Sequence, residues 1–272
     1  KADFPETYAP HTATIRAMIE NVGVAPRGFV TGLHESLQPR FQTATVRPQG
    51  VSDVLTAMPK RTRTQYRQAV RRQAEVYRGA NENLDEFLKV IHATEEEKGI
   101  SLRSGAYYER ILDAYDDDAY LMLCTLNIVN AIDETSKNKR HELSEQIASR
   151  KKSLAEMEER HEIDGDQVTL AGCLAVGYGT GFEILYAGTN RDYATIPAQD
   201  LVWVDTLQLA FDGGANYASL GGVDGSLDVS LLTFKSRFNA EIFEKIGEFD
   251  LVNNKPLYAA FDWLMTRRSN DD

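Results

Sequence analysis

Apolar and polar positions follow two different periods along this chain. Apolar residues that recur every three to four positions are typical of amphipathic helices, and short alternating or continuous apolar runs are typical of strands. The helices predicted in this way span residues 10–21, 51–58, 84–98, 106–115, 197–211 and 230–238. The predicted strands span residues 41–46, 119–129, 167–178, 183–187 and 217–220. Strands and helices mixed in this order predict an α+β or α/β fold.

A basic stretch from Lys60 to Arg78 also shows helical spacing. It carries seven basic residues against the single acidic Glu75. A solvated helix face and a phosphate-contacting surface explain this pattern equally well.

A second charged stretch, residues 134–162, contains no glycine or proline and should be helical. Predicted strands flank it, so the chain must leave the sheet and return to it. A short antiparallel helical hairpin that turns near residues 149–152 fits that requirement better than one long helix. The apolar positions near heptad spacing, which favour a coiled-coil seam, are Leu143, Ile147, Leu154 and Met157.

Composition narrows the classes of protein that this chain can represent. With 272 residues, 42% of them hydrophobic, it can bury a substantial core. A net charge of -11 argues against a protein that coats nucleic acid indiscriminately. No run of eighteen apolar residues and no signal region is present, which predicts a cytoplasmic protein. Cys124 and Cys173 lie in apolar strand-like segments, so we expect both in the core.

The usual catalytic and cofactor motifs are missing. No phosphate-binding Walker loop, dinucleotide fingerprint, metalloprotease helix motif or acyl-CoA signature occurs, and the five histidines show no ligand spacing. We therefore expect no cofactor and no metal site. The glycines of residues 177–181 fall between two predicted strands and indicate a hairpin turn rather than a phosphate loop.

One glycine-rich segment does indicate a possible site. Residues 220–225, Leu-Gly-Gly-Val-Asp-Gly, allow a close approach of the backbone, and Lys235 ends the segment Ser-Leu-Leu-Thr-Phe-Lys that follows. The residues alone leave two interpretations open, a surface lysine in a salt bridge and a lysine that serves a function.

The order of several motifs resembles the Fem family of peptidoglycan-bridge aminoacyltransferases. The motifs of the C-terminal half are Ile184-Leu-Tyr-Ala-Gly188, Pro197, Leu220-Gly-Gly222, Leu232-Thr-Phe-Lys235 and Ile246-Gly-Glu-Phe-Asp250. The earlier ones are the basic helix after Pro59, the Gly99-Ile-x-x-Arg103 loop with Tyr107, the charged insert and the Val168-Thr-Leu-Ala-Gly172 strand.

The resemblance implies an α+β fold of two tandem acetyltransferase-like (GNAT) domains. It assigns residues 39–250 to the second domain, and residues 134–163 within it to an inserted helical, coiled-coil-like arm. Residues 1–38 and 251–272 would then be the remnant of an incomplete first domain.

The resemblance also implies the activity and its partners. The enzyme would take an amino acid from aminoacyl-tRNA and add it to the stem peptide of a UDP-linked muramyl pentapeptide or of lipid II. A lipid-linked acceptor would bring it to the inner face of the plasma membrane.

Site residues carry over from the family one position at a time. Lys235 and Phe234 would lie near the aminoacyl ester, and Arg103, Tyr107 and Tyr186 would line the muropeptide site. Arginine pairs with phosphate oxygens, and tyrosine offers a ring face and a hydroxyl. The candidate tRNA contacts are Lys60, Arg63, Arg67 and Arg71, together with residues 137–152 of the arm.

Two positions depart from the family pattern. Ser219 stands where an aspartate often precedes the Leu-Gly-Gly run, and Trp203 stands where a glutamine is common. Acceptor selectivity therefore stays open. So do three alternatives. The first is a transferase of this fold that acts on another amine, and the second is an acyl-CoA-dependent enzyme, which the missing pyrophosphate loop disfavours. The third is a non-catalytic module that binds a precursor or a partner.

Overall fold

A computed structural model describes residues 12–26, 39–137, 144–223, 229–245 and 249–270. The chain forms two compact units. Unit 1 comprises residues 1–44, 221–236 and 241–272, and unit 2 comprises residues 45–220 and 237–240. The assignment of the sequence to two acetyltransferase-like domains stays a prediction, and most of residues 1–38 lie outside the described part.

A mixed sheet forms the centre of unit 2, with strand order β3-β4-β5-β6-β7-β2-β8. The strands from β3 to β6 run antiparallel to their neighbours, and β7 runs parallel to β6. The division between the units passes through β2, β7 and β8, and all of β8 except Ala240 belongs to unit 1. The strand bounds are β2 Phe41–Val46, β3 Ala74–Gly79, β4 Ala119–Asn127, β5 Gln167–Tyr178, β6 Gly181–Thr189, β7 Tyr217–Val223 and β8 Ala240–Glu244.

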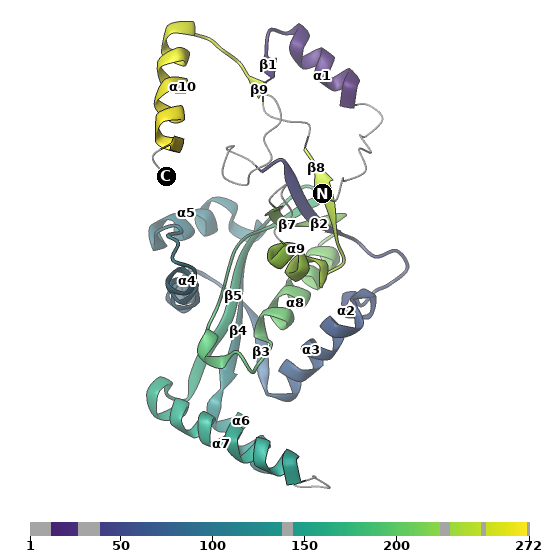
Figure 1. Cartoon of the computed structure of the whole chain (residues 1–272). Helices are drawn as coiled ribbons and strands as arrows, with labels where there is room; N and C mark the ends of the chain where they lie inside the picture. The colour runs from purple at the N-terminus through teal and green to yellow at the C-terminus, as the bar shows by residue number, and fades with distance from the viewer. Residues whose placement is uncertain (1–11, 27–38, 138–143, 224–228, 246–248, 271–272) are drawn as a thin grey trace. The chain divides into compact units, whose positions relative to one another are not determined.

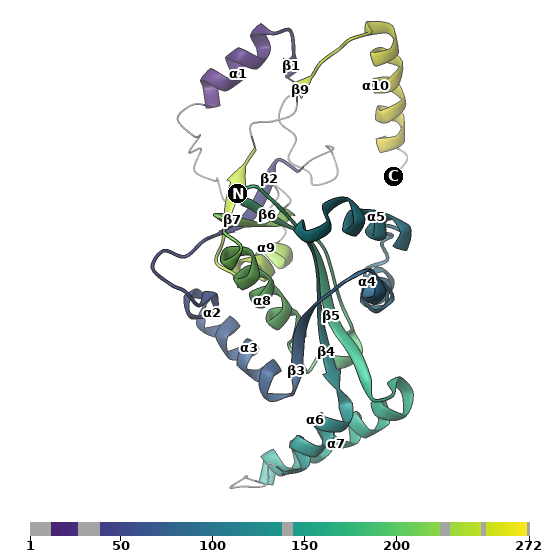
Figure 2. The same cartoon turned by 180° about the vertical axis from the view of Figure 1, so that it is seen from behind.

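Helices cover both faces of this sheet in unit 2 (Figures 1 and 2). On one face lie α4 (Leu84–Lys98) and α5 (Gly105–Tyr115), and on the other lie α3 (Lys60–Arg71) and α8 (Ala198–Asp212), with α2 (Val54–Ala57) beside them. Because both faces are covered, the central strands are apolar almost throughout. Cys124 and Cys173 are fully buried, as expected from the sequence.

Glycines shape two contacts of β6. The β5–β6 hairpin turns at Gly179, whose φ of 58° favours glycine, and Tyr178 pairs with Gly181 across the turn. This confirms the predicted hairpin. At Gly188, a Cβ would lie 2.4 Å from the carbonyl oxygen of Val90 on α4. The glycine of the Ile-Leu-Tyr-Ala-Gly motif therefore lets α4 pack directly against β6.

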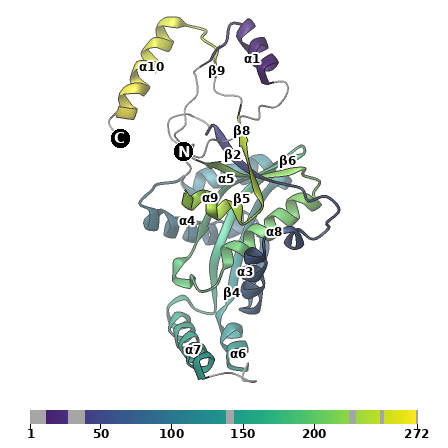
Figure 3. The same cartoon turned by 45° about the vertical axis from the view of Figure 1, so that its right-hand side comes forward.

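The predicted helical insert is a pair of packed helices, α6 (Ile128–Lys137) and α7 (Ser144–Asp164), at the end of β4 and β5 (Figure 3). The prediction of two helices is confirmed, but two details are wrong. The arm begins at Ile128, directly after β4, and α7 continues unbroken through residues 149–152, where the turn was expected. Residues 138–143, between the helices, lie outside the described part.

Unit 1 contains smaller elements. Strands β1 (Ala25–Pro26) and β9 (Phe249–Asp250) pair antiparallel. Its helices are α1 (Thr12–Asn21), α9 (Val229–Ser236) and α10 (Lys255–Asn270). Across the described part of the chain, no helix has the length and apolarity that a membrane span requires.

The α+β fold class is confirmed, and one predicted helix needs correction. The basic stretch is not a single helix to Arg78, because α3 ends at Arg71 and β3 begins at Ala74. Arg78 lies on β3, where its guanidinium stacks over Tyr120 at 4.3 Å and donates to the carbonyl oxygens of Asp117 and Ala119 at 2.7 Å. The Arg78 guanidinium therefore binds groups at the edge of the sheet and is not part of the basic face of the helix.

Candidate functional site

Arg103 and three tyrosines gather where α5 meets the sheet in unit 2. The Arg103 guanidinium lies 5.6 Å from the centre of the Tyr107 ring. Tyr186, on β6, meets Tyr107 edge to face at 6.1 Å and Tyr108 at 5.0 Å. Edge-to-face packing at these distances is favourable for aromatic rings. The structure thus brings together Arg103, Tyr107 and Tyr186, which the sequence places 83 positions apart at most.

Main-chain hydrogen bonds hold the Arg103 loop in place. Helix α4 ends at Gly99, which adopts a left-handed C-cap with φ of 62°. The Leu102 amide then donates to the Glu95 carboxylate, and the Arg103 amide donates to the Tyr108 hydroxyl at 3.2 Å. Because the backbone is fixed, the exposed Arg103 side chain leaves the loop in a defined direction.

Burial and hydrogen bonds within this cluster shift the pKa values of its tyrosines. Burial raises the pKa of Tyr186, and a hydrogen bond with Tyr107 raises it further, while a hydrogen bond with Arg103 lowers it. Burial also raises the pKa of Tyr108. The hydroxyls of Tyr108 and Tyr186 thus stay protonated near neutral pH, and a phenol hydroxyl can both donate and accept. An arginine and neutral phenols at one edge suit a phosphorylated ligand that also carries sugar or peptide groups.

Lys235 occupies a different environment, in unit 1. Its side chain on α9 is only 5% exposed, and its Nζ donates to the carbonyl oxygen of Gly222 at 2.6 Å. Burial lowers the pKa of Lys235 from 10.5 to about 8. The interpretation as a surface lysine is therefore wrong. Phe234, the neighbouring candidate, is half-buried.

The glycine run shapes the surroundings of this lysine. Gly221 has φ of 87°, and a Cβ there would lie 3.6 Å from Lys235 Nζ. The Thr43 hydroxyl, on β2, donates to the Gly221 carbonyl oxygen at 3.0 Å and holds this part of the strand. A distance of 3.6 Å is an ordinary van der Waals contact, so the positive φ explains the glycine at position 221, and the expected close approach of the backbone to another group stays a prediction.

The basic candidates of α3 lie opposite its buried side. At 100° per residue, Lys60, Arg63, Arg67 and Arg71 share one side of the helix, while Thr62 and Ala69 are buried. Lys60, Arg67 and Arg71 are exposed. Arg63 is half-buried, and its guanidinium donates to the Met58 carbonyl oxygen at 2.7 Å, so part of its role is to cap α2. We call the exposed side with Lys60, Arg67 and Arg71 the α3 basic face.

A polar contact on the inner side of α3 fixes its orientation. The Tyr66 hydroxyl donates to the Asp205 carboxylate of α8 at 2.8 Å. Burial and Asp205 raise the pKa of Tyr66, so this bond persists over the ordinary pH range. This bond fixes the side of α3 that packs against α8, so the opposite side, which carries the basic residues, stays exposed.

Sequence reasoning missed some of the supporting residues. Tyr108 and Glu95 hold the Arg103 loop, yet neither lies in a recognisable motif. The pair Tyr107-Tyr108 was a usable signal, because two adjacent tyrosines on a helix direct one ring to the core and one to its edge. The Arg103 cluster belongs to unit 2 and Lys235 to unit 1.

Comparisons with known proteins all identify relatives in one family. The model of the FemAB family matches residues 3–136 and 129–266. A lipid II:glycine glycyltransferase of Staphylococcus epidermidis is 26% identical over 93% of this chain and 68% of its own length. The proteins of that name from Staphylococcus saprophyticus and Staphylococcus aureus are 27% and 26% identical. A crystal structure of FemX, 24% identical, matches with a TM-score of 0.76 over 92% of this chain and 71% of that chain, which shows a shared fold.

Proposed function

Because this chain belongs to the FemAB family, we propose that it transfers an amino acid from aminoacyl-tRNA to the stem peptide of a peptidoglycan precursor. The observation that carries this proposal is the match, along nearly the whole chain, to relatives named for glycyl transfer to lipid II. Lipid II is therefore the acceptor that we favour over the soluble nucleotide-linked precursor. Such an acceptor would place the protein at the inner face of the plasma membrane.

The reaction needs no cofactor, because the ester of aminoacyl-tRNA is already activated. A free amine of the stem peptide attacks the ester carbonyl carbon, and the C–N bond forms as the C–O bond breaks. The amine loses a proton, and the ribose oxygen of the tRNA gains one. Orientation of the two substrates and stabilisation of the tetrahedral oxyanion can supply much of the acceleration.

Lys235 is our candidate for the group that stabilises this charge. An ammonium has three donors, and the bond to Gly222 uses one of them. At pH 7 a lysine with a pKa of about 8 is still mostly protonated, and it is acidic enough to pass a proton to a leaving alkoxide. If the ammonium is the active form, the factor by which Lys235→Met lowers transfer shrinks as the pH rises above 8. A factor that grows with pH would instead indicate that the neutral amine acts as a base. Titration of the acceptor amine affects both proteins and cancels in this ratio.

The Arg103 cluster is our candidate for the muropeptide site, with Arg103 on the diphosphate. Replacing Arg103 with alanine should raise KM for the precursor about tenfold or more, because charge-assisted hydrogen bonds contribute roughly 1.5–3 kcal/mol. The matched control is Arg110→Ala, which removes an exposed arginine from α5 itself. Equal KM values for the two variants would exclude Arg103 from the site.

The α3 basic face is our candidate for the tRNA contact, together with the Lys137 to Lys152 part of the arm. Changing Arg67 and Arg71 to glutamate should weaken tRNA binding and reduce the slope of log K against log salt by about 1 for each phosphate that the helix no longer binds. The control reverses two exposed charges on α4, Lys89 and Lys98. Unchanged binding in the α3 variant would mean that the helix is merely solvated.

The reaction itself is tested with a pool of total tRNA charged with radiolabelled amino acids. The chain is incubated with this pool and with either lipid II or the nucleotide-linked precursor, and the label on each precursor is counted. We expect label on lipid II, with none after ribonuclease treatment of the tRNA. Label on neither precursor would exclude this function for the chain.

A further inference from the structure

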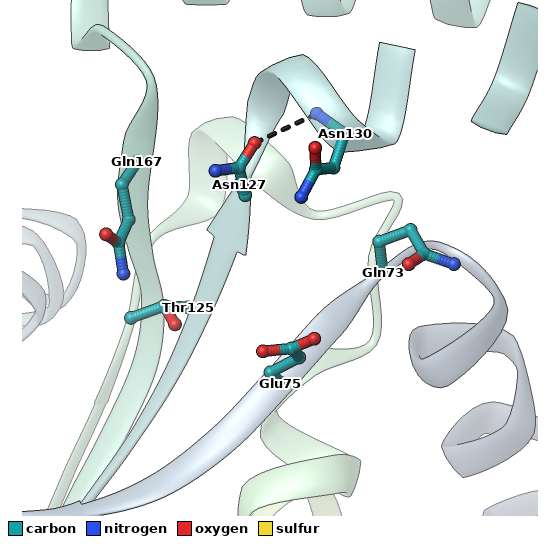
Figure 4. Close-up of a pocket in the computed structure, with 6 residues that line it drawn as sticks. All are labelled: Gln73, Glu75, Thr125, Asn127, Asn130 and Gln167. Carbon is teal, nitrogen blue, oxygen red and sulfur yellow. Dashed lines mark hydrogen bonds between the residues drawn. The ribbon is translucent and has the colours of Figure 1, made fainter. Parts of the chain in front are cut away.

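A polar cavity of about 260 Å³ opens at the end of the sheet where the arm begins (Figure 4). Three neighbouring strands contribute to it, since Glu75 pairs with Thr125 and Asn127 pairs with Gln167 in the strand register. A register shift next to Thr125 distorts the ladder at this point, as is common beside binding sites. The lining residues are Gln73, Glu75, Thr125, Asn127, Asn130 and Gln167.

All six lining residues have polar side chains, which offer both donors and acceptors. Four of the six side chains are carboxamides, each with one donor group and one acceptor. The side-chain oxygen Oδ1 of Asn127 accepts from the main-chain N–H of Asn130 at 2.9 Å, which directs the Asn127 side-chain amino group away from that bond. Glu75 supplies the single charge, and it is negative. A phosphate is therefore a poor occupant, whereas a neutral group with amino hydrogens is a good one.

Gln73 shows that this site carries backbone strain. It follows the C-cap of α3 with φ of 65°, a conformation that glycine usually supplies at this position. A non-glycine residue there costs about 1 kcal/mol or more. Arg71 of the α3 basic face precedes it by only two positions. The cavity thus lies directly beside the proposed phosphate-binding helix, and the residue that joins the two is strained.

We propose that this cavity binds an unpaired nucleotide of the RNA held by the α3 basic face, with a preference for bases that carry an exocyclic amino group. The inference rests on the proposed function. Carboxamides pair with the donor–acceptor edge of adenine, and carboxylates accept from base amino groups. Single-stranded RNA ends can turn their bases outward for such contacts. The basic face supplies affinity and the cavity supplies base preference.

The first test uses RNA hairpins with 3′ tails of four adenosines, cytidines or uridines, and measures binding by fluorescence anisotropy. The wild-type chain should prefer the adenosine and cytidine tails over the uridine tail about tenfold. Glu75→Gln should reduce that preference to about threefold, because the charge-assisted bond is lost. Removal of a negative charge alone would strengthen binding to every RNA alike and leave the preference unchanged, so a reduced preference is not a general charge effect. The control is Glu82→Gln, which removes an exposed carboxylate beyond the other end of β3.

A second variant separates binding from folding. Gln73→Gly removes one carboxamide and relieves the strained conformation, so its thermal stability should equal or exceed that of the wild type. Its tail preference should nevertheless fall. The cavity proposal is overturned if the wild type binds all three tails equally, or if both variants keep the preference. Either result leaves the proposal that aminoacyl-tRNA is the donor unaffected. If no hairpin and no tRNA binds the wild type, the donor assignment fails and the cavity proposal fails with it.

Discussion

Replacing Lys235 with methionine should change how the stability of the protein depends on pH. The wild-type lysine has a pKa of about 8 in the folded state and 10.5 in the unfolded chain. Between these values the unfolded chain binds more protons than the folded protein, so wild-type stability rises with pH. Methionine has a similar length and no charge, so the variant lacks this dependence.

The size of the effect follows from the two pKa values. Burial of the charged lysine costs about 3 kcal/mol at pH 7 and about 1 kcal/mol at pH 10, since one pKa unit corresponds to about 1.4 kcal/mol. The hydrogen bond to Gly222 is absent from the variant at every pH, which shifts its stability by a constant amount to first order. The change with pH therefore isolates the buried charge.

The assay is urea unfolding of both proteins at pH 7 and pH 10. Groups that titrate in both proteins cancel in the difference. We expect the stability of Lys235→Met relative to wild type to fall by about 2 kcal/mol between these pH values. Lys89→Met, which replaces an exposed lysine, should show no such change. A difference for Lys235→Met that stays constant with pH would refute the argument that burial lowers this pKa.

Two further predictions concern unit 2. Gly188→Ala should destabilise the protein by about 1–3 kcal/mol in urea unfolding, because its Cβ would lie 2.4 Å from a main-chain oxygen of α4. The control Gly177→Ala should be tolerated, because the atom nearest to its Cβ would lie 3.5 Å away. Equal losses of stability in the two variants would argue against the close approach of α4 to Gly188. In a titration of Tyr186 followed by NMR with ring-labelled tyrosine, Arg103→Gln should raise the pKa and Tyr107→Phe should lower it, and shifts in the same direction would contradict the hydrogen bonds inferred here.

The periodicity of apolar residues predicts the bounds of an element correctly where one face of that element is buried. Helix α4 begins and ends at the predicted residues, and β2 matches its prediction at both ends. Local signals failed where the pattern continued across a boundary. The basic charges ran on from α3 into β3, and the apolar residues of β4 ran on into Ile128, the first residue of α6.

The candidate site was predictable only in part, because motifs identify residues and not their partners. The sequence indicated Lys235 and the glycine run, but burial of the lysine depends on the packing of distant segments. Thr43 illustrates this, since it contacts Gly221 across 178 positions. The polar cavity had no sequence signal at all, because its residues come from three strands and two helix ends and share no motif.

The most direct test of the proposed transfer is the mass of lipid II after incubation with the chain and aminoacyl-tRNA. We expect a gain of one or more whole amino-acid residues on the stem peptide. The gain should disappear when ribonuclease digests the tRNA beforehand, and it should be strongly reduced in Lys235→Met. An unchanged mass, or the same gain from free amino acid without tRNA, would contradict the proposed transfer.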